Sequence, residues 1–408
     1  MIDIVSKEDC VGCKACGDIC PVNAIAYEID DEGFWFPKIN NEKCVHCEKC
    51  SSACPVICTP KRLELNDSEP QGFGVYHNNK NVRYNSTSGG MYYALGELIL
   101  SKGGYLVGCE FNDDYTAAIH TVENTENGLK KLMRTKYFQS DTEGIFKETE
   151  NLLKDQKIVL FCGAPCQVGA LYNFLGKEYD NLYTVDFICR GINTPYVYNK
   201  YMEELKCKYK SEIKEVHFKD KSKGWTTLGT RVRFKNGKEY YRNKDNDPWV
   251  NAFNIAYLYA RKGCSNCRFK GFPRPADISF GDFWGPKWYP EFSDEDNYYG
   301  VSAALANNEK GKCLIESATE YMKIWMVDYK KIVEGNGALI QTFPQNPRRD
   351  EFFERIKKEP YSRVVWDIMG MKTPKRQLIN AYKSMLLFIR AHMPEPLMNI
   401  YRSIRYKQ

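Results

Sequence analysis

The sequence has no long hydrophobic run. Its longest strongly apolar stretch is Met385 to Ile389, far below the ~20 residues that a membrane-spanning helix needs. The first residues lack the apolar segment and cleavage site of a secretory signal peptide. The 17 cysteines are an odd number for a secreted disulfide framework, so they are interpreted as thiols in a reducing compartment. We therefore expect a cytoplasmic protein, or one held peripherally at the inner face of the membrane.

What the sequence does contain is a repeat of cysteines. Four cysteines precede Pro21 and four precede Pro55, and each cysteine of the first run recurs 34 residues later. This is the C-x2-C-x2-C-x3-C-P spacing of bacterial ferredoxins, in which the fourth cysteine of each run binds the other four-iron cluster. The first cluster is expected on Cys10, Cys13, Cys16 and Cys54, and the second on Cys44, Cys47, Cys50 and Cys20.

Two zinc sites would also use four cysteines each. Zinc sites rarely carry this run twice with a closing proline, so we favour iron-sulfur clusters. Residues 24–40 predict two short strands around an Asp-Glu-Gly turn. Cys58 has no position in the pattern and is interpreted as a bystander thiol.

After Pro60 the sequence alternates between strand-like and helix-period segments. Helices are predicted over 90–101, 126–133, 143–154, 167–175 and 196–209, and strands over 105–111, 157–162 and 182–189. A hairpin is predicted around Asn236 and Gly237. This pattern indicates an α/β (α+β) fold in which a ferredoxin-like di-cluster domain precedes a mixed-sheet domain.

Four further cysteines suggest a third metal site. Cys166 lies where a strand passes into a helix, Cys189 ends the next apolar strand, and Cys264 and Cys267 form a C-x2-C pair. Successive parallel strands end at the same sheet edge, which would bring these thiols together. A third four-iron cluster, a zinc site and a thiol-disulfide pair all remain open here, as does Cys162 in place of Cys166. Cys109, Cys207 and Cys313 are interpreted as packing residues.

Five motifs in order resemble the coenzyme F420 hydrogenase/dehydrogenase beta-subunit family, from about Gly72 to Glu309. They are NSTSGGMYYAL, RTKYFQSD, LFCGAPCQVGAL, VDFICRGINTP and CSNCRFKGFPRPADISFGDFWG. The resemblance implies a catalytic domain that binds FAD and one four-iron cluster, with the cluster on Cys166, Cys189, Cys264 and Cys267. The family commonly has Cys-His-Gly where this chain has Arg190, so an acid-base role at that position is in doubt.

A flavin also suits a chain of iron-sulfur clusters, because flavins exchange single electrons and also carry out hydride chemistry. Two glycine-containing turns before helices, Ser88-Gly89-Gly90 and Gly163-Ala164-Pro165, would let backbone amides approach a pyrophosphate. Asp282 ends an apolar strand and either shapes the flavin pocket or turns a core corner. The predicted FAD-binding residues are Ser88, Gly89, Gly90, Lys136, Tyr137, Gln139, Gly163, Pro165, Gln167 and Asp282.

The net charge of +6 is concentrated at the carboxyl end. Residues 372–408 hold eight Lys or Arg residues and one acid, Glu395. Pro374 and Pro394 bracket a predicted helix with an apolar stripe on one side, formed by Leu378, Ile379, Tyr382, Met385, Leu386 and Ile389. It could lie on an anionic membrane, clamp a partner or pack on its own domain. No nucleic-acid-binding module is recognised.

The domains are predicted at 1–65 (ferredoxin-type), 66–350 (FAD and iron-sulfur, catalytic) and 351–408 (helical basic extension). The leading hypothesis is an oxidoreductase, with the reductase direction favoured. Electrons would pass from two ferredoxin-type clusters through a third to FAD and then to an organic substrate or deazaflavin-type coenzyme. The predicted partner is a ferredoxin or another oxidoreductase subunit. The alternatives are a non-catalytic electron-transfer subunit, for which a membrane-proximal place in surface-polysaccharide biosynthesis is one setting, and a scaffold with structural clusters.

Overall fold

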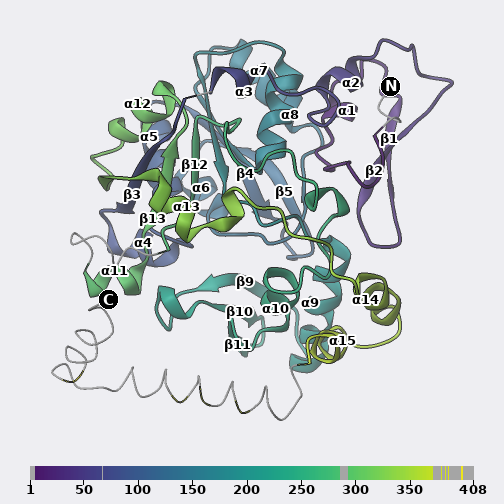
Figure 1. Ribbon diagram of the computed structural model, residues 1–408, viewed down its shortest axis with the longest axis vertical. Helices are drawn as coiled ribbons and strands as arrows, with labels where there is room; N and C mark the ends of the chain where they lie inside the picture. The colour runs from purple at the N-terminus through teal and green to yellow at the C-terminus, as the bar shows by residue number, and fades with distance from the viewer. Residues whose placement is uncertain are drawn as a thin grey trace.

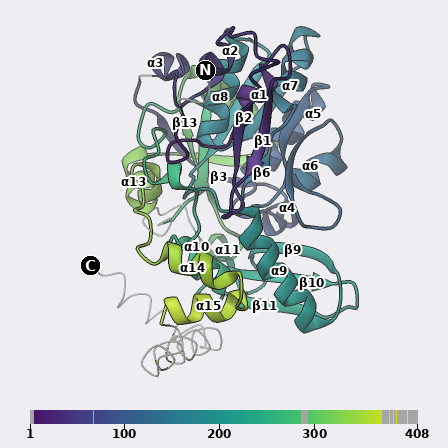
Figure 2. The same cartoon turned by 90° about the vertical axis from the view of Figure 1, so that its right-hand side faces the viewer.

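The computed structural model describes residues 5–66, 68–284 and 293–370, and also Leu378, Tyr382, Met385 and Leu397. Three parts are visible in Figure 1: the amino-terminal part with β1 and β2, a large central sheet, and a small sheet formed by β9, β10 and β11. Turning the molecule shows the amino-terminal hairpin running alongside the central sheet (Figure 2). The α/β class with an amino-terminal ferredoxin-type part is confirmed.

The amino-terminal part contains the predicted hairpin between the two cysteine runs. Strands β1 (Ile25–Ile29) and β2 (Trp35–Ile39) pair antiparallel, with Tyr27 opposite Pro37. The short helices α1 (Ala15–Asp18) and α2 (Lys49–Ala53) each follow a cysteine loop and contact one another. This contact brings the second cysteine run back against the first.

The central sheet of the described chain has nine strands in the order β14-β3-β13-β12-β8-β7-β4-β5-β6. β4, β7, β8 and β12 are mutually parallel, and β13 pairs antiparallel with both β12 and β3. The mixed sheet expected from the sequence is therefore confirmed. The strand bounds are β3 (Gln71–His77), β4 (Tyr105–Phe111), β5 (Ala118–Glu123), β6 (Ser140–Asp141), β7 (Val159–Gly163), β8 (Leu182–Phe187), β12 (Ile278–Asp282), β13 (Ser302–Ala306) and β14 (Met322–Val327).

Two hydrophobic cores sandwich this sheet because its central strands are apolar on both faces, as parallel strands covered by helices are. α5, α6 and α12 share one core with β3 and β4, and α7 and α8 share the other with α1 and α2. The helix bounds are α3 (Arg62–Leu65), α4 (Lys80–Asn85), α5 (Met91–Ser101), α6 (Glu126–Leu132), α7 (Ile145–Lys154), α8 (Pro165–Leu175), α11 (Asp294–Tyr299), α12 (Glu309–Ser317) and α13 (Tyr329–Gly335).

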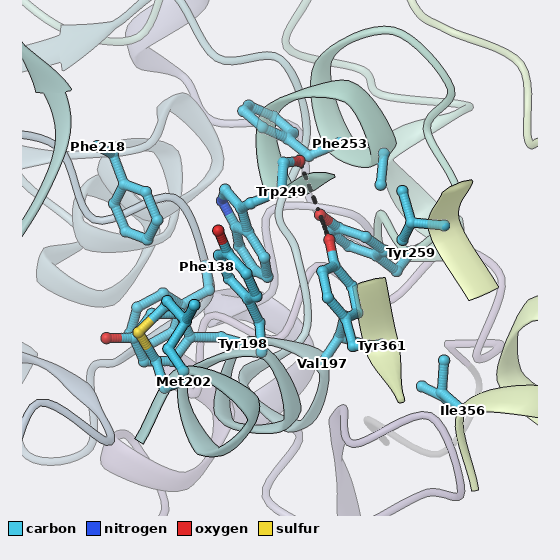
Figure 3. Packing of buried hydrophobic residues seen from close by; sticks show 14 of the residues in the cluster. Phe138, Val197, Tyr198, Met202, Phe218, Trp249, Phe253, Tyr259, Ile356 and Tyr361 are labelled. Carbon is cyan, nitrogen blue, oxygen red and sulfur yellow. Dashed lines mark hydrogen bonds between the residues drawn. The ribbon is translucent and has the colours of Figure 1, made fainter. Parts of the chain in front are cut away.

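A third core lies under the small sheet. Strands β9 (Ile213–Asp220), β10 (Gly229–Phe234) and β11 (Glu239–Asn243) are antiparallel, and Gly237 turns the predicted hairpin at φ 83°. Tyr259 donates a hydrogen bond to the Trp249 carbonyl at 3.0 Å, and its hydroxyl lies 3.0 Å from that of Tyr361 (Figure 3). The helices of this core are α9 (Pro195–Tyr209), α10 (Pro248–Asn254), α14 (Arg349–Ile356) and α15 (Tyr361–Ile368).

Most of the predicted basic helix lies outside the described residues. Leu378, Tyr382 and Met385 are helical and exposed. Among the helices in the described ranges, none combines the length and apolar character needed to cross a bilayer.

Asp247 gives the third core a pH dependence. This buried residue caps α10 and accepts hydrogen bonds from the Tyr201 hydroxyl and the Val250 amide. Burial raises its pKa from 3.8 to about 6. The unfolded carboxyl ionises at lower pH than the folded one, so the folded state loses stability as the pH rises through this window.

Asp247→Asn keeps a helix-capping side chain and removes the ionisation. The unmodified protein should lose stability between pH 5 and pH 8, and the variant should not. We therefore expect the free energy of unfolding of the variant, minus that of the unmodified protein, to be about 1 kcal/mol larger at pH 8 than at pH 5. Urea denaturation of anaerobically purified protein at both pH values measures this difference. An equal difference at the two pH values would contradict the assignment.

Candidate metal and flavin site

The first predicted cluster set lines a single cavity. Cys10, Cys13, Cys16 and Cys54, together with Tyr27 and Trp35, line about 360 Å³ of empty space, counting the part open to solvent. Cys54 directly follows α2, so the α1–α2 contact delivers it to the first run. The Tyr27 hydroxyl lies 3.6 Å from Cys16 Sγ. Four thiols facing one space are what a four-iron cube requires.

The sequence repeat is also a backbone repeat. Gly12 and His46 have φ of 69° and 54°, and Lys14 and Glu48 have φ of 59° and 60°. These two pairs are separated by the same offset as the cysteines. Left-handed residues within such loops turn backbone amides toward one concave side, an arrangement common around iron-sulfur sites.

The second predicted set lies closer to solvent. Cys47 is exposed, and Cys20, Cys44 and Cys50 are partly buried. The amide of Ala24 donates to Cys20 Sγ at 3.2 Å. The two cysteine sets of the amino-terminal part therefore differ in exposure, with the first set inside and the second at the surface.

The third predicted set also converges. Cys166, Cys189, Cys264 and Cys267 line one cavity with about 690 Å³ of empty space, counting the part open to solvent. Cys166 lies in the first turn of α8, and Cys189 lies two residues beyond β8. Because β7 and β8 are parallel, both positions fall at the same sheet edge. The 3₁₀ turn η3 (Lys262–Cys264) brings the remaining pair.

Burial disfavours free thiolates in this cavity. It raises the pKa of Cys264 to about 12 and that of Cys166 well above its ordinary value. The Gly191 amide donates to Cys189 Sγ and the Ile192 amide to Cys264 Sγ, both at 3.3 Å. These donors fit sulfur that carries negative charge, as a thiolate bound to iron does.

Within the described ranges, no three His, Cys, Asp or Glu side chains are close enough to hold one metal ion together. The four thiols of the first set and the four of the third each line a shared space. Cys162 is not among the residues that line either cavity. Burial raises its pKa to about 12, and Cys109, Asp186 and Lys136 are ionisable groups near it.

The first and third cavities share a wall. Val11 lines both of them, and it packs against the hydrophobic residues on each side. Gly263 presses against the first cysteine loop, where an added Cβ would lie 2.9 Å from the Asp9 carbonyl oxygen. The Val11 side chain is thus common to the walls of two cysteine-lined spaces.

Arg261 holds this contact in place. Its buried guanidinium donates to the carbonyls of Cys10 at 2.6 Å and Trp35 at 2.9 Å, and to Gln139 Oε1 at 3.1 Å. The Gln139 amide in turn donates to the Gly12 carbonyl at 3.1 Å. Gln139, predicted beside the flavin, is therefore hydrogen-bonded to the ferredoxin-type part.

A second group of predicted flavin residues lies at the edge of the third cavity. Pro165 lines the cavity at the start of α8. Gln167 accepts a hydrogen bond from the Ala164 amide at 2.7 Å and donates to Ser140 Oγ at 3.1 Å. Gly163 ends β7. These residues connect the strand end to the helix that carries Cys166.

The Ser88-Gly89-Gly90 turn lies at the same sheet edge, near β13. Ser88 Oγ donates to the Val301 carbonyl at 2.6 Å, and the Gly89 amide donates to Ser302 Oγ at 3.0 Å. A Cβ at Gly89 would lie 2.3 Å from the Val75 carbonyl oxygen, so the turn requires glycine for close packing. Gly90 precedes α5 with φ 92°.

Asp282 and Tyr137 meet residues that the sequence did not single out. Asp282 pairs with Lys219 and accepts from the Trp225 indole at 3.2 Å. The Lys219 ammonium lies 5.9 Å from the centre of the Tyr137 ring. The segment after β9 therefore lies over the sheet edge, and its alternating cations in 217–223 were the available signal.

Two cations at this edge, partly buried Lys136 and buried Lys221, are held by carbonyl oxygens. Lys136 donates to the carbonyls of Cys109 at 2.8 Å and Met133 at 2.7 Å, and burial lowers its pKa to about 8. Lys221 donates to the carbonyls of Arg83 and Ser88 at 2.6 and 2.7 Å, and burial lowers its pKa well below the ordinary value. Neither ammonium has a carboxylate within ion-pair distance in the described part of the chain.

Residues 156–332 match the family model for the carboxyl-terminal part of the coenzyme F420 hydrogenase/dehydrogenase beta subunit. Residues 9–58 match the 4Fe-4S dicluster domain. Residues 156–332 are thus related to the coenzyme F420 hydrogenase/dehydrogenase beta subunit, and a 4Fe-4S dicluster domain precedes them. The predicted resemblance to this family is confirmed.

One solved structure similar to this chain is a xenon derivative of the F420-reducing [NiFe] hydrogenase complex from Methanosarcina barkeri. The two chains are 16% identical with a TM-score of 0.46, over 67% of this chain and 91% of that chain. No curated protein is similar enough to this chain to count as a match.

The hydrogen bonds of Arg261 generate a testable prediction. Arg261→Met leaves the three oxygen acceptors without their donor, which costs about 3 kcal/mol at order of magnitude. We expect the Cys10–Lys14 loop to exchange its amide hydrogens at least tenfold faster, as measured by hydrogen exchange with mass spectrometry.

Arg268→Met is the matched control, because exposed Arg268 donates a single bond to the same part, to the Val56 carbonyl at 2.8 Å. Equal exchange rates in the two variants would show that Arg261 does not hold the contact.

Proposed function

We propose that this protein is an iron-sulfur flavoprotein oxidoreductase. Two ferredoxin-type clusters pass single electrons through a third four-iron cluster to FAD, and from there to an organic substrate or coenzyme. The supporting observation is the pair of cysteine-lined cavities that share Val11 as a wall. A structural role for the clusters gives no reason for two such cavities to adjoin.

The proposed chain of clusters has a surface end and an inner end. The second cysteine set is the exposed one, so it is the natural contact for a redox partner protein. The first set is more buried and adjoins the third. The third set lies at the carboxyl edge of parallel strands, where open α/β sheets bind their ligands.

The residues at this edge fit FAD. Partly buried Lys136 and buried Lys221 have no carboxylate within ion-pair distance among the described residues, and they would favour an anionic pyrophosphate. The Ser88–Gly90 turn lies within hydrogen-bond reach of Lys221. When bound, the flavin would supply hydride chemistry and accept single electrons. Lys219, Asp282 and Trp225 form a fixed polar group that would position the ring or the substrate.

Iron content tests the assignment of Cys166, Cys189, Cys264 and Cys267 as ligands of a third cluster. Unmodified, anaerobically purified protein should hold about twelve irons and one FAD, since each cluster holds four irons. Cys264→Ser should lower iron to about eight, abolish substrate reduction and leave the two amino-terminal clusters spectroscopically intact. Cys58→Ser and Cys162→Ser are matched controls that should keep about twelve irons. Unchanged iron in Cys264→Ser, or loss of four irons in Cys162→Ser, would contradict the assigned ligands.

The flavin residues are tested by the ratio of flavin to iron. Lys219→Met removes the cation between Asp282 and Tyr137, so we expect flavin content to fall several-fold while iron content stays constant. Lys223→Met is the control, because Lys223 is an exposed cation four residues away. Gel filtration of both variants verifies folding. Full flavin retention in Lys219→Met would place the cofactor elsewhere.

Substrate turnover separates the enzyme from a pure electron carrier. If the isolated chain is an enzyme, dithionite-reduced flavin will be reoxidised by a small organic acceptor without another protein. If oxidation requires a partner protein in every case, the non-catalytic electron-transfer subunit is the better description.

A further inference from the structure

The walls of the first and third cavities differ in charge. Among the described residues that line the third cavity there are four cations and no carboxylate: Arg190, Arg261, Lys270 and Arg274. The first cavity has Lys14 as the cation in its described lining. The Lys14 ammonium lies 2.7 Å from carboxylate oxygens of both Asp141 and Glu143. The Lys14 charge beside the first cavity is thus compensated by two carboxylates, whereas Lys270 beside the third cavity has no carboxylate within ion-pair distance in the described part of the chain.

This contrast is already present in the sequence. Apart from Val11, Pro165 and Cys166, the lining of the third cavity comes from residues 187–202, 248–276 and 335–349. None of these three ranges contains an aspartate or a glutamate. Every segment that reaches this cavity after α8 is therefore free of acids, although Asp and Glu make up 52 of the 408 residues.

The four cations are not equivalent. Arg274 is neutralised by buried Asp186 at 2.6 Å. Lys270 donates to the carbonyls of Cys189 at 2.6 Å and Ala338 at 2.5 Å. The hydrogen bonds of Arg261 go to neutral oxygen acceptors. Arg261 contacts residues of both cavities, because it lines the third and donates to the Cys10 carbonyl of the first. Lys270 therefore brings an uncompensated charge to the third cavity alone.

Arg190 adds a fourth, more exposed charge. It lies over the Phe343 ring at 5.5 Å, and no carboxylate of the described chain pairs with it. Water and salt screen an exposed charge more than a buried one. Its influence on the cavity should therefore be smaller than that of Lys270.

We infer that the third cluster has a higher reduction potential than the first, and that Lys270 is the main residue that sets this difference. The inference rests on the proposed function, since it requires a cluster in each cavity. Reduction adds one electron to a cluster, and nearby uncompensated cations stabilise the added negative charge. Net charge and hydrogen bonds to sulfur are among the factors that set iron-sulfur potentials.

The consequence is a direction of electron flow. The first cluster loses one electron and the third gains it, with no proton required. This step is downhill from the ferredoxin-type part toward the sheet edge. Electrons would accumulate next to the proposed flavin, which matches the reductase direction. Lys270 acts through its positive charge on the potential of the third cluster, and it makes no contact with the substrate.

The test is a redox titration of the full-length holoprotein followed by electron paramagnetic resonance. Cys264→Ser lacks the third cluster and so identifies its signal. As the applied potential is lowered, we expect the signal of the third cluster to appear before that of the first. Lys270→Met should move the midpoint potential of the third cluster to a more negative value and leave the first unchanged. Lys270→Arg should keep most of the original value.

Lys262→Met is the matched control, because Lys262 is a cation of the same loop that does not line the cavity. It should shift neither midpoint by as much as Lys270→Met. Arg190→Gln provides a second variant if Lys270→Met fails to fold, with a smaller negative shift that grows at low ionic strength.

Two results would overturn the inference while the proposed function stands. One is reduction of the third cluster only below the potential of the first. The other is an unchanged midpoint in both Lys270→Met and Arg190→Gln at about twelve irons per chain. If the unmodified protein holds about eight irons and two cluster signals, the proposed function itself fails and takes this inference with it.

Discussion

The contact between the Gly263 turn and the first cysteine loop is the constraint on which the site depends. It joins residues more than 250 positions apart, and it is possible only because position 263 carries no side chain to collide with the carbonyls of Asp9 and Cys10. Arg261 then fixes the two loops by donating to both the Cys10 and Trp35 carbonyls. Without this contact the two cysteine cavities would not share Val11.

The central sheet supplies the second requirement, a common edge. β7 and β8 are parallel neighbours, so the chain leaves each at the same side of the sheet, and Cys166 and Cys189 follow from that geometry. β12 is parallel to β8, which places Asp282 on the same side. The small sheet closes over this edge through Lys219 and Trp225. The strand order of the central sheet therefore places the cavity of the third cysteine set beside the edge that carries Asp282 and Lys219.

Much of this could be predicted from the sequence. The duplicated cysteine run predicts that the fourth cysteine of each run belongs to the cluster of the other run. The apolar runs before Cys166 and Cys189 indicate parallel strands. The hairpin at Asn236 and Gly237 was equally local, because a positive φ at Gly237 is a property of that turn alone. Each of these signals lies within a short window of sequence.

Other features could not be predicted because they arise from pairing between distant segments. In the sequence, Val11 is only a residue between two predicted ligands. Arg261 is only a cation that precedes a cysteine pair. The sequence suggested that Gln139 faces a cofactor, whereas its side chain bonds Gly12 and Arg261 across the domain contact. The insertion of β3 between β13 and β14 likewise follows from tertiary pairing of strands far apart in the chain.

The placement of charge follows from the same contacts. A cube bound by four thiolates carries net negative charge, and a buried site must compensate that charge or exclude the cluster. The positive charges beside the first and third cysteine sets are held in different ways. Near the first site, Lys14 forms ion pairs with Asp141 and Glu143. These ion pairs join the first cysteine loop to the segment before α7. Near the third, Lys270 donates its hydrogen bonds to the neutral carbonyls of Cys189 and Ala338. Its positive charge therefore stays available to the third cavity, whereas Arg261, which builds the domain contact, lies against both cavities.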